Sequence, residues 1–145
     1  MAIKVKSVML WRRDTENRPG MLASTLEPLA RAGADLKVVM GYGYPGEPGR
    51  AAMELYPVSG KKATAAAQGA GLFPSSIPTL LVEGDNRPGL AHAIARAIAQ
   101  AGININFLVA QSIGKKYSAI FGFHTKADAK IAAGLIRKAK PAPRK

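Results

Sequence analysis

The sequence predicts an α+β fold made of two similar halves, and three observations support that class. The tetrapeptide Asn-Arg-Pro-Gly occurs at residues 17–20 and again at residues 86–89, 69 positions later. The same offset aligns Ala-Arg-Ala-Gly at 30–33 with Ala-Gln-Ala-Gly at 99–102. In both halves an alternating apolar stretch precedes a stretch of helical period, and two further alternating stretches follow. A repeat that keeps one offset across several elements indicates a duplicated domain.

The first copy begins with an alternating segment at residues 2–13, which we expect to be a single strand. Pro19 suits the first position of the next helix, where a missing N–H loses no hydrogen bond. That helix should bury a stripe of leucines and bend, without breaking, at Pro28. A hairpin of two strands and a helix over 61–71 complete the copy. The residues expected to face the core of this copy are Leu22, Leu26, Leu29, Leu36, Val38, Met40, Met53 and Leu55.

The second copy repeats this order. A strand at 76–84 leads to Pro88 and a helix, a hairpin follows, and a helix at 126–139 closes the copy. Thr125 with Asp128 three residues later is typical of a capping box at the start of that last helix. The residues expected to face the core of this copy are Leu90, Ile94, Ile98, Ile105, Phe107, Val109, Phe121 and Phe123.

The order β-α-β-β-α, twice, predicts antiparallel sheets with helices on one face, the arrangement of ferredoxin-like (βαββαβ-type) domains. We expect the first repeat at residues 1–72 and the second, with its basic C-terminal tail, at 73–145. A fourth strand is hard to find in either repeat, because Pro74 interrupts the segment 72–76 and the second copy has no further segment. We therefore expect the strands at 2–13 and 76–84 to pair across the copies and join one continuous sheet.

Composition narrows the function classes. The chain has 145 residues, is 48% hydrophobic and contains no cysteine, which argues against disorder and excludes disulfides, thiol catalysis and thiolate-bound zinc. The first residues alternate in polarity, unlike a signal peptide, and no apolar run has the length of a membrane span. We therefore expect a cytoplasmic protein that does not bind a membrane.

The charge is strongly basic. The formal net charge is +12, and residues 73–145 hold 11 basic and 3 acidic side chains. Nucleic acid is thus a partner to consider, but nucleic-acid-binding domains of this topology need aromatic side chains on the open face of the sheet. Phe121 and Phe123 have the parity of the buried face, and Trp11, Tyr42 and Tyr44 are expected at the edge of the core or in a hairpin.

The repeated turn itself suggests a binding site. Backbone N–H groups at the start of a helix have no partner within the helix, and together with the helix dipole they attract carboxylates. Glycine within the first helical turn allows a ligand to approach closely. Asn17 and Asn86 add side chains that both donate and accept hydrogen bonds.

These residues resemble the ACT domain. The segment "VEGDNRPGLAHAIARAIAQAGININ" (82–106) has the full pattern of strand, Asn-Arg-Pro-Gly turn, helix ending in Ala-Gly and apolar-Asn-apolar strand. The segment "RRDTENRPGMLASTLEPLARAGADL" (12–36) has it with variations. The resemblance implies two tandem regulatory domains that bind a small molecule, most often an amino acid, at the seam between two domains. The matching positions are Asn17, Arg18, Gly20, Met21 and Asp35 in the first copy and Asn86, Arg87, Gly89, Leu90 and Asn104 in the second.

Two departures from the family pattern matter. Many members of the family carry Asp where this chain has Asn17 and Asn86, so a role that needs a negative charge there does not transfer. Asp35 stands where the second copy has Asn104, so the two seams should differ.

No catalytic constellation is apparent. His92, His124, Glu54 and Glu83 share no ligand spacing along a helix, and we expect no metal, no cofactor and no enzymatic activity. The apolar residues Val39, Tyr56, Leu108 and Ile120 are expected on the sheet face away from the helices, which favours a homodimer.

The sequence therefore predicts a non-catalytic module that binds an amino acid or a similar carboxylate and acts through assembly or through a regulated partner protein. Two alternatives stay open, a dimerisation module without a ligand and a nucleic-acid-binding protein with ferredoxin-like domains.

Overall fold

The computed structural model describes residues 3–141, and residues 142–145 of the expected basic tail lie outside this range. The chain forms two compact units, which we call the first unit (residues 9–76) and the second unit (residues 77–141 together with 3–8). None of the described helices has the length and apolar content needed to cross a membrane. The elements in chain order are β1 (Lys4–Val8), β2 (Trp11–Glu16), α1 (Met21–Arg31), β3 (Val38–Tyr44), β4 (Glu47–Tyr56), α2 (Lys61–Gly69), β5 (Phe73–Pro74), β6 (Thr79–Asp85), α3 (Leu90–Gln100), β7 (Ile105–Ile113), β8 (Lys116–Phe123) and α4 (Lys126–Lys138).

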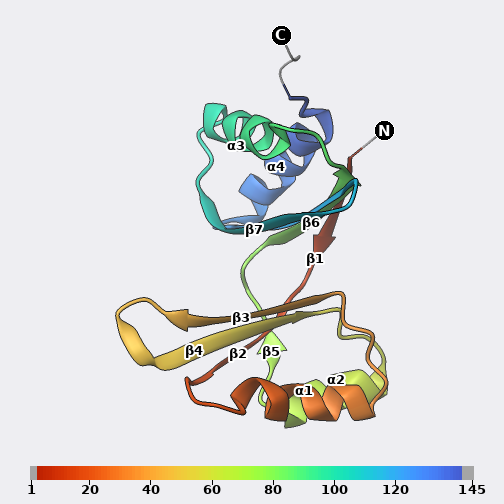
Figure 1. The fold of residues 1–145 in the computed structure, drawn as a ribbon, viewed down its shortest axis with the longest axis vertical. Helices are drawn as coiled ribbons and strands as arrows, with labels where there is room; N and C mark the ends of the chain where they lie inside the picture. The colour runs from red at the N-terminus through yellow and green to blue at the C-terminus, as the bar shows by residue number, and fades with distance from the viewer. Residues whose placement is uncertain (1–2, 142–145) are drawn as a thin grey trace. The chain divides into compact units, whose positions relative to one another are not determined.

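The two units have the same spatial arrangement of strands and helices, although the fourth strand comes from a different part of the chain in each. The sheets have the strand orders β3-β4-β2-β5 and β1-β6-β8-β7, and all their pairings are antiparallel. In each unit the two helices cover one face of the sheet (Figure 1). This confirms the predicted α+β class with two ferredoxin-like repeats.

The fourth strand of the second unit comes from the start of the chain. β1 pairs with β6 over Lys4↔Glu83 to Val8↔Thr79. The pairing between segments 2–13 and 76–84 is therefore as expected, but the continuous sheet is not formed. The segment 2–13 is two strands, because the chain leaves one sheet after Val8 and enters the other at Trp11. For the same reason the division differs from the expected boundary at 72 and 73, since residues 3–8 belong to the second unit.

The fourth strand of the first unit is short. β5 comprises only Phe73 and Pro74, and it pairs with Trp11 and Arg12 of β2. Proline has no N–H to donate to a ladder, so it is tolerated at the edge of a sheet, where β5 lies. The segment at 72–76, interrupted by proline, thus does supply a strand.

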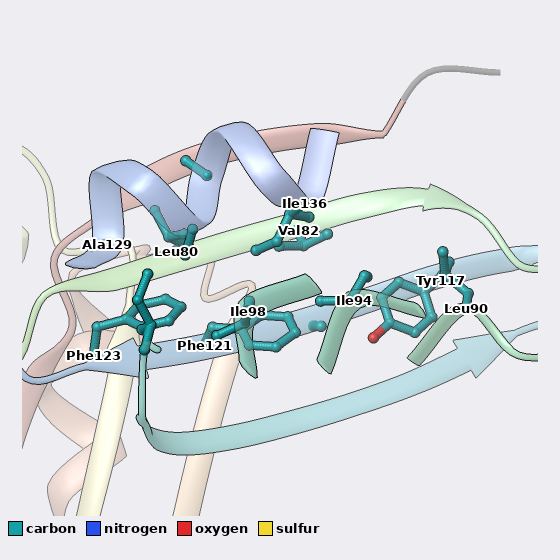
Figure 2. Packing of buried hydrophobic residues seen from close by; sticks show 14 residues of the cluster. Leu80, Val82, Leu90, Ile94, Ile98, Tyr117, Phe121, Phe123, Ala129 and Ile136 are labelled. Carbon is teal, nitrogen blue, oxygen red and sulfur yellow. The ribbon is translucent and has the colours of Figure 1, made fainter. Parts of the chain in front are cut away.

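The core of the second unit lies between its sheet and α3 and α4. Ile94 and Ile98 of α3, Ile136 of α4, and Phe121 and Phe123 of β8 belong to one buried cluster (Figure 2), and all five side chains are at most 1% exposed. The spacing of four residues in α3 explains this stripe, because such positions lie on one helix face. The parity predicted for the two phenylalanines is confirmed.

The core of the first unit contains Trp11, Leu29, Leu55, Ala67 and Leu72. Leu22 is 40% exposed and does not belong to it; Thr25 is the buried residue one turn before Leu29. The Thr25 hydroxyl accepts a hydrogen bond from Arg13 Nη1 at 2.7 Å and donates one to the carbonyl of Met21 at 2.7 Å, so this buried polar group is satisfied.

Two further expectations concern helices α1 and α4. Helix α1 is not broken at Pro28, whose carbonyl accepts a bond from the N–H of Ala32 at 3.1 Å. At the start of α4 the Thr125 hydroxyl accepts a bond from the N–H of Asp128 at 3.0 Å, as the capping box predicts.

The apolar residues expected on the open sheet faces divide between the two sides. Val39 pairs with Leu55, and Leu108 pairs with Phe121. Because paired residues in a ladder point to the same face, Val39 and Leu108 lie on the helix side, at the edge strands β3 and β7. The prediction for these two residues was wrong, since β7 shifts register between Ile105 and Phe107 and β3 follows the parity of Leu55. For the same reason the strand residues expected to face the core that alternate with them lie on the open face instead, namely Val38, Met40, Phe107 and Val109.

Candidate functional site

The repeated Arg-Pro-Gly sequence forms the same turn in both units. The N–H of Met21 donates to the carbonyl of Arg18 at 3.4 Å, and the N–H of Leu90 donates to that of Arg87 at 3.1 Å. Gly20 has φ 89° and ψ −8°, and Gly89 has φ 86° and ψ 0°. These are type II turns, which favour proline at the second position and glycine at the third. The prolines therefore precede the helices and the glycines are N-caps, so each helix starts two residues later than expected.

The backbone conformation alone explains why glycine occupies these positions. A side chain at φ near +90° is strained, whereas glycine is not. A Cβ added at Gly20 would meet no atom within 4 Å, so crowding is not the reason for this glycine. The shared shape of the two turns is thus a property of the chain itself, with or without a ligand.

Replacing Gly20 or Gly89 by alanine is expected to lower the free energy of unfolding by about 1–2 kcal/mol, because the left-handed conformation is unfavourable for a residue with a Cβ. Gly134→Ala is the control. Gly134 lies inside α4, and a Cβ added there would meet open space, so alanine should stabilise the protein by about 0.5–1 kcal/mol. Urea unfolding of the three variants measures both signs. If alanine at both turns lowered the free energy of unfolding by less than about 0.3 kcal/mol, the type II geometry would be contradicted.

The asparagines that precede the turns are tied to the neighbouring hairpins. The N–H of Asn17 donates to the carbonyl of Gly49 at 3.0 Å, and the N–H of Asn86 donates to that of Lys115 at 2.8 Å. The Asn17 side-chain nitrogen lies against Gly43, at 3.1 Å from the position of an added Cβ. Both turns are therefore held against the hairpin of their own sheet by the same backbone bond.

In the first unit four of the five predicted residues line one cavity. Asn17, Arg18, Gly20 and Met21 border a hollow of about 320 Å³, whose other wall comes from β3 and β4 through residues such as Gly43 and Met53. The guanidinium of Arg18 is paired with Glu16 at 2.9 Å, and both side chains are largely exposed. Polar turn groups thus face small and apolar side chains across the hollow.

Asp35 lies elsewhere in the first unit. It follows the end of α1, is paired with Lys37 at 2.6 Å, and lines a different cavity of about 540 Å³ with Gly33 and Lys61. The structure of the first unit therefore does not bring Asp35 to the turn, because the full length of α1 separates them.

In the second unit the predicted residues divide among different places. Arg87 and Leu90 line a cavity of about 330 Å³, and Gly89 lines a second one of about 400 Å³. Asn86 and Asn104 are not among the described residues that border either cavity. The end of the described chain lies close by, since Pro141 Cβ is 3.7 Å from the position of a Cβ added at Gly89.

A polar cluster on the first unit was not predicted. Arg12 donates from Nη1 to the Tyr42 hydroxyl at 2.8 Å, and from Nη2 to Asp14 at 2.9 Å and to the Tyr44 hydroxyl at 2.5 Å. Tyr42 also donates to Glu54 Oε2 at 3.1 Å, and Tyr44 donates to Asp14. The sequence offered one signal for it: Arg12 and Asp14 on one strand, and Tyr42 and Tyr44 on another, are two residues apart and therefore lie on the same face of the sheet. We call these five residues the Arg12 cluster.

Glu54 is the buried acid of the Arg12 cluster. Its side chain is 1% exposed, and among the described residues its Oε1 has no hydrogen-bond partner. Burial raises the pKa of Glu54, while the hydrogen bond from Tyr42 and the charge of Arg12 oppose this shift. Asp14 behaves oppositely, because hydrogen bonds from Tyr44 and Arg12 lower its pKa.

The Arg12 cluster distinguishes the first unit from the second. Arg12 pairs with Glu54 in the first sheet, and the corresponding pair in the second sheet is Leu81 with Ile120. The duplication has therefore kept the turn and diversified the open face of the sheet.

No metal site emerges among residues 3–141, where no three His, Asp or Glu side chains are grouped as a metal ion requires. Glu54 belongs to the first unit, whereas Glu83, His92 and His124 belong to the second.

Comparison with known families identifies part of the chain. Residues 78–140, which are less than half of the chain and lie within the second unit, match the family model of the ACT domain. No curated protein matches the sequence.

Solved structures resemble the chain over nearly its whole length. A protein of Bacteroides thetaiotaomicron has a TM-score of 0.72 at 14% sequence identity, with 92% of this chain and 98% of that chain covered. The ligand-free regulatory subunit of aspartate kinase from Thermus thermophilus has a TM-score of 0.65 at 18% identity, with 96% and 97% covered. The corresponding subunit from Thermus flavus has a TM-score of 0.59 at 16% identity, with 94% and 95% covered. At these identities the likeness establishes the fold.

Proposed function

We propose that the chain is a non-catalytic regulatory module of two tandem ACT domains that binds an amino acid or a similar small carboxylate. The observation that supports this best is the shared construction of the two units. Only the second lies under the family match, yet the first has the same strand order and the same type II turn before its first helix. Two of the structures that share the fold are described as regulatory subunits of aspartate kinase, which agrees with such a role.

We assign the ligand to the turns. In the first unit the carboxylate would bind at the turn formed by Asn17, Arg18, Gly20 and Met21, where the helix dipole favours a negative charge and the cavity has room for a small side chain. In the second unit the counterparts are Asn86, Arg87, Gly89 and Leu90. Asp35 and Asn104 would act from the opposite side of a seam with another domain.

The module would transmit its state through assembly or through a regulated partner. The edge strands β3 and β7 expose Val39, Val109 and Ile113, which are 47%, 47% and 71% exposed. Unpaired edges with apolar side chains favour association, and a homodimer is the simplest closed form. The alternative is a dimer that forms without any ligand. Sedimentation equilibrium distinguishes the two, because an amino acid should change the oligomeric state only if assembly depends on the ligand.

A thermal-shift screen of the full chain with the twenty amino acids tests the ligand. One or a few amino acids should raise the melting temperature, since a ligand at a hundred times its Kd adds about 2.7 kcal/mol of stability. Gly20→Asp places a competing carboxylate at the first turn and should reduce the shift, and Gly20→Asp/Gly89→Asp should abolish it. Gly33→Asp is the control, because Gly33 also has a positive φ of 76° but lies at the other end of α1. A screen without any shift, or a shift reduced equally by Gly20→Asp and Gly33→Asp, would contradict the proposal.

A further inference from the structure

The segment that follows the second helix takes a different course in each of the two units. After α2 the chain enters the first sheet as β5. After α4 that route is closed, because β1 already occupies the fourth position of the second sheet. Ala139 is extended, with φ −66° and ψ 134°, and the following residues lie against the turn before α3, where Pro141 approaches Gly89.

This course builds a basic cavity. Arg87 of the turn, Arg137 of α4 and Lys140 line the hollow of about 330 Å³, together with Ile3 and Leu90. Arg137 is held there by a hydrogen bond from Nη2 to the carbonyl of Val5 in β1, at 3.3 Å. The swapped strand therefore both directs the chain end to the turn and positions one of the cations.

The positive charge of this cavity is only partly compensated within the described chain, where the charges of Lys116 and Arg87 both help to lower the pKa of Asp85. Asp85 is the single acidic residue of its lining, and its carboxylate is engaged by Lys116 at 2.9 Å. Among residues 3–141 no carboxylate lies within ion-pair distance of Arg87, Arg137 or Lys140. Three like charges around one hollow repel each other, and an anion between them would relieve that repulsion.

The first unit has no such site. Its corresponding arginine, Arg18, is paired with Glu16, and residues 70–73 after α2 contain no basic side chain. The basic cavity is therefore not a feature of the repeated turn, and it accounts for part of the excess charge of residues 73–145.

We propose that this cavity binds a small dianion that carries a phosphate group. Two guanidinium groups match phosphate oxygens in paired hydrogen bonds, and a lysine adds a third donor. A volume of about 330 Å³ admits a phosphate or a small phosphate ester. The site shares Arg87 and Leu90 with the proposed amino-acid site of the second unit, whereas Arg137 and Lys140 belong to the phosphate site alone.

Isothermal titration calorimetry of the full chain with inorganic phosphate at pH 7.5, with ionic strength held constant by sodium chloride, tests the site. Saturable binding of one phosphate per chain is expected. Arg137→Gln and Lys140→Gln should each weaken it about tenfold, the typical size of one lost charge-assisted contact. Lys138→Gln is the control, because it removes the same charge beside Arg137 but from a residue that does not line the cavity. Thermal melts of each variant verify folding.

Three outcomes would overturn the site: heats that do not saturate, equal weakening by Lys138→Gln, or an oligonucleotide that binds all variants alike and is not displaced by phosphate. The last would indicate a diffuse basic surface instead. Glycerol 3-phosphate distinguishes the two sources of the same chemistry. Tighter binding of the ester identifies a phosphate ester as the ligand, and tighter binding of phosphate identifies the free ion.

Discussion

Deleting residues 1–8 is expected to unfold the second unit while the first unit stays folded. The deletion removes β1, and with it the whole ladder from Lys4↔Glu83 to Val8↔Thr79. Ile3 and Val5 pack on the core of the second unit, and Val8 is 9% exposed. Full burial of an aliphatic side chain contributes about 1.5–3 kcal/mol, and Ile3 and Val5 are partly buried. Their loss, together with Val8 and the ladder, removes a large part of the total stability of a small domain. Amide hydrogen exchange by NMR should show lost protection in residues 77–141 and retained protection in 9–76.

The decisive control supplies β1 after the C-terminal end of the second unit, through a linker. A permuted chain of residues 77–141, a Gly/Ser linker and residues 3–8 should fold by itself, because all four strands of the sheet are then present. The same chain with Val5→Asp should not fold, since the carboxylate would enter the core that Val5 covers. Cooperative unfolding of residues 77–141 alone, without any β1, would show that the swapped strand is dispensable.

This strand also marks the limit of what the sequence could predict about the fold. Alternation within residues 2–13 and the helical stripe at Leu90, Ile94 and Ile98 are local patterns. They identified the class correctly, but residues 2–13 were expected to be one strand and form two. The partner of β1 lies more than seventy residues away. The alternation does break at the apolar run of residues 8–11, where the chain passes from one sheet to the other, but this run does not indicate which strand β1 pairs with. Pairing over such a distance depends on which sheet lacks an edge strand, which no local pattern records.

The candidate site was predictable to a similar degree. Proline and glycine in the repeated turn indicated a helix start, and the structure adds that Gly20 and Gly89 are required by their positive φ. The cavity at the first turn also contains residues of β3 and β4, which join it only through the register of the hairpin. The Arg12 cluster was missed for the same reason. Tyr42 and Tyr44 were expected in the core edge or a hairpin, and only the pairing of β2 and β3 with β4 places them beside Arg12 and Glu54.

Replacing Arg12 by methionine should destabilise the first unit by about 3 kcal/mol at pH 7, because it leaves the buried Glu54 carboxylate without its cation. Glu54 Oε2 is 3.6 Å from Arg12 Nη1, and its other oxygen has no partner within the described chain. The comparison variant is Arg31→Met. Arg31 forms an exposed pair with Glu27 on α1, so its loss should change the stability by less than about 0.5 kcal/mol.

The cost of Arg12→Met should depend on pH in a direction set by Glu54. Burial raises the pKa of this carboxyl above the ordinary value of 4.5, so the folded state takes up a proton that the unfolded state releases. The stability contributed by the protonated acid is fully present below the ordinary pKa and is lost as the pH rises through the raised pKa of the folded state. The difference between wild type and Arg12→Met should therefore be small near pH 4 and grow toward pH 7. Urea unfolding across this range measures it.

The double variant Arg12→Met/Glu54→Gln isolates the cause of that difference. Glutamine keeps the shape of the acid without its charge, so at pH 7 the double variant should recover most of the stability that Arg12→Met loses. Near pH 4 it should differ little from the single variant, because Glu54 is then protonated. If the loss in Arg12→Met were equal at both pH values, or if glutamine gave no recovery, the arginine would stabilise the unit through Asp14 and the two tyrosine hydroxyls, which are its other hydrogen-bond partners. The buried acid is thus tolerated in the first unit because Arg12 compensates its charge, and the second unit, with Leu81 and Ile120 at these positions, has no charge to compensate there.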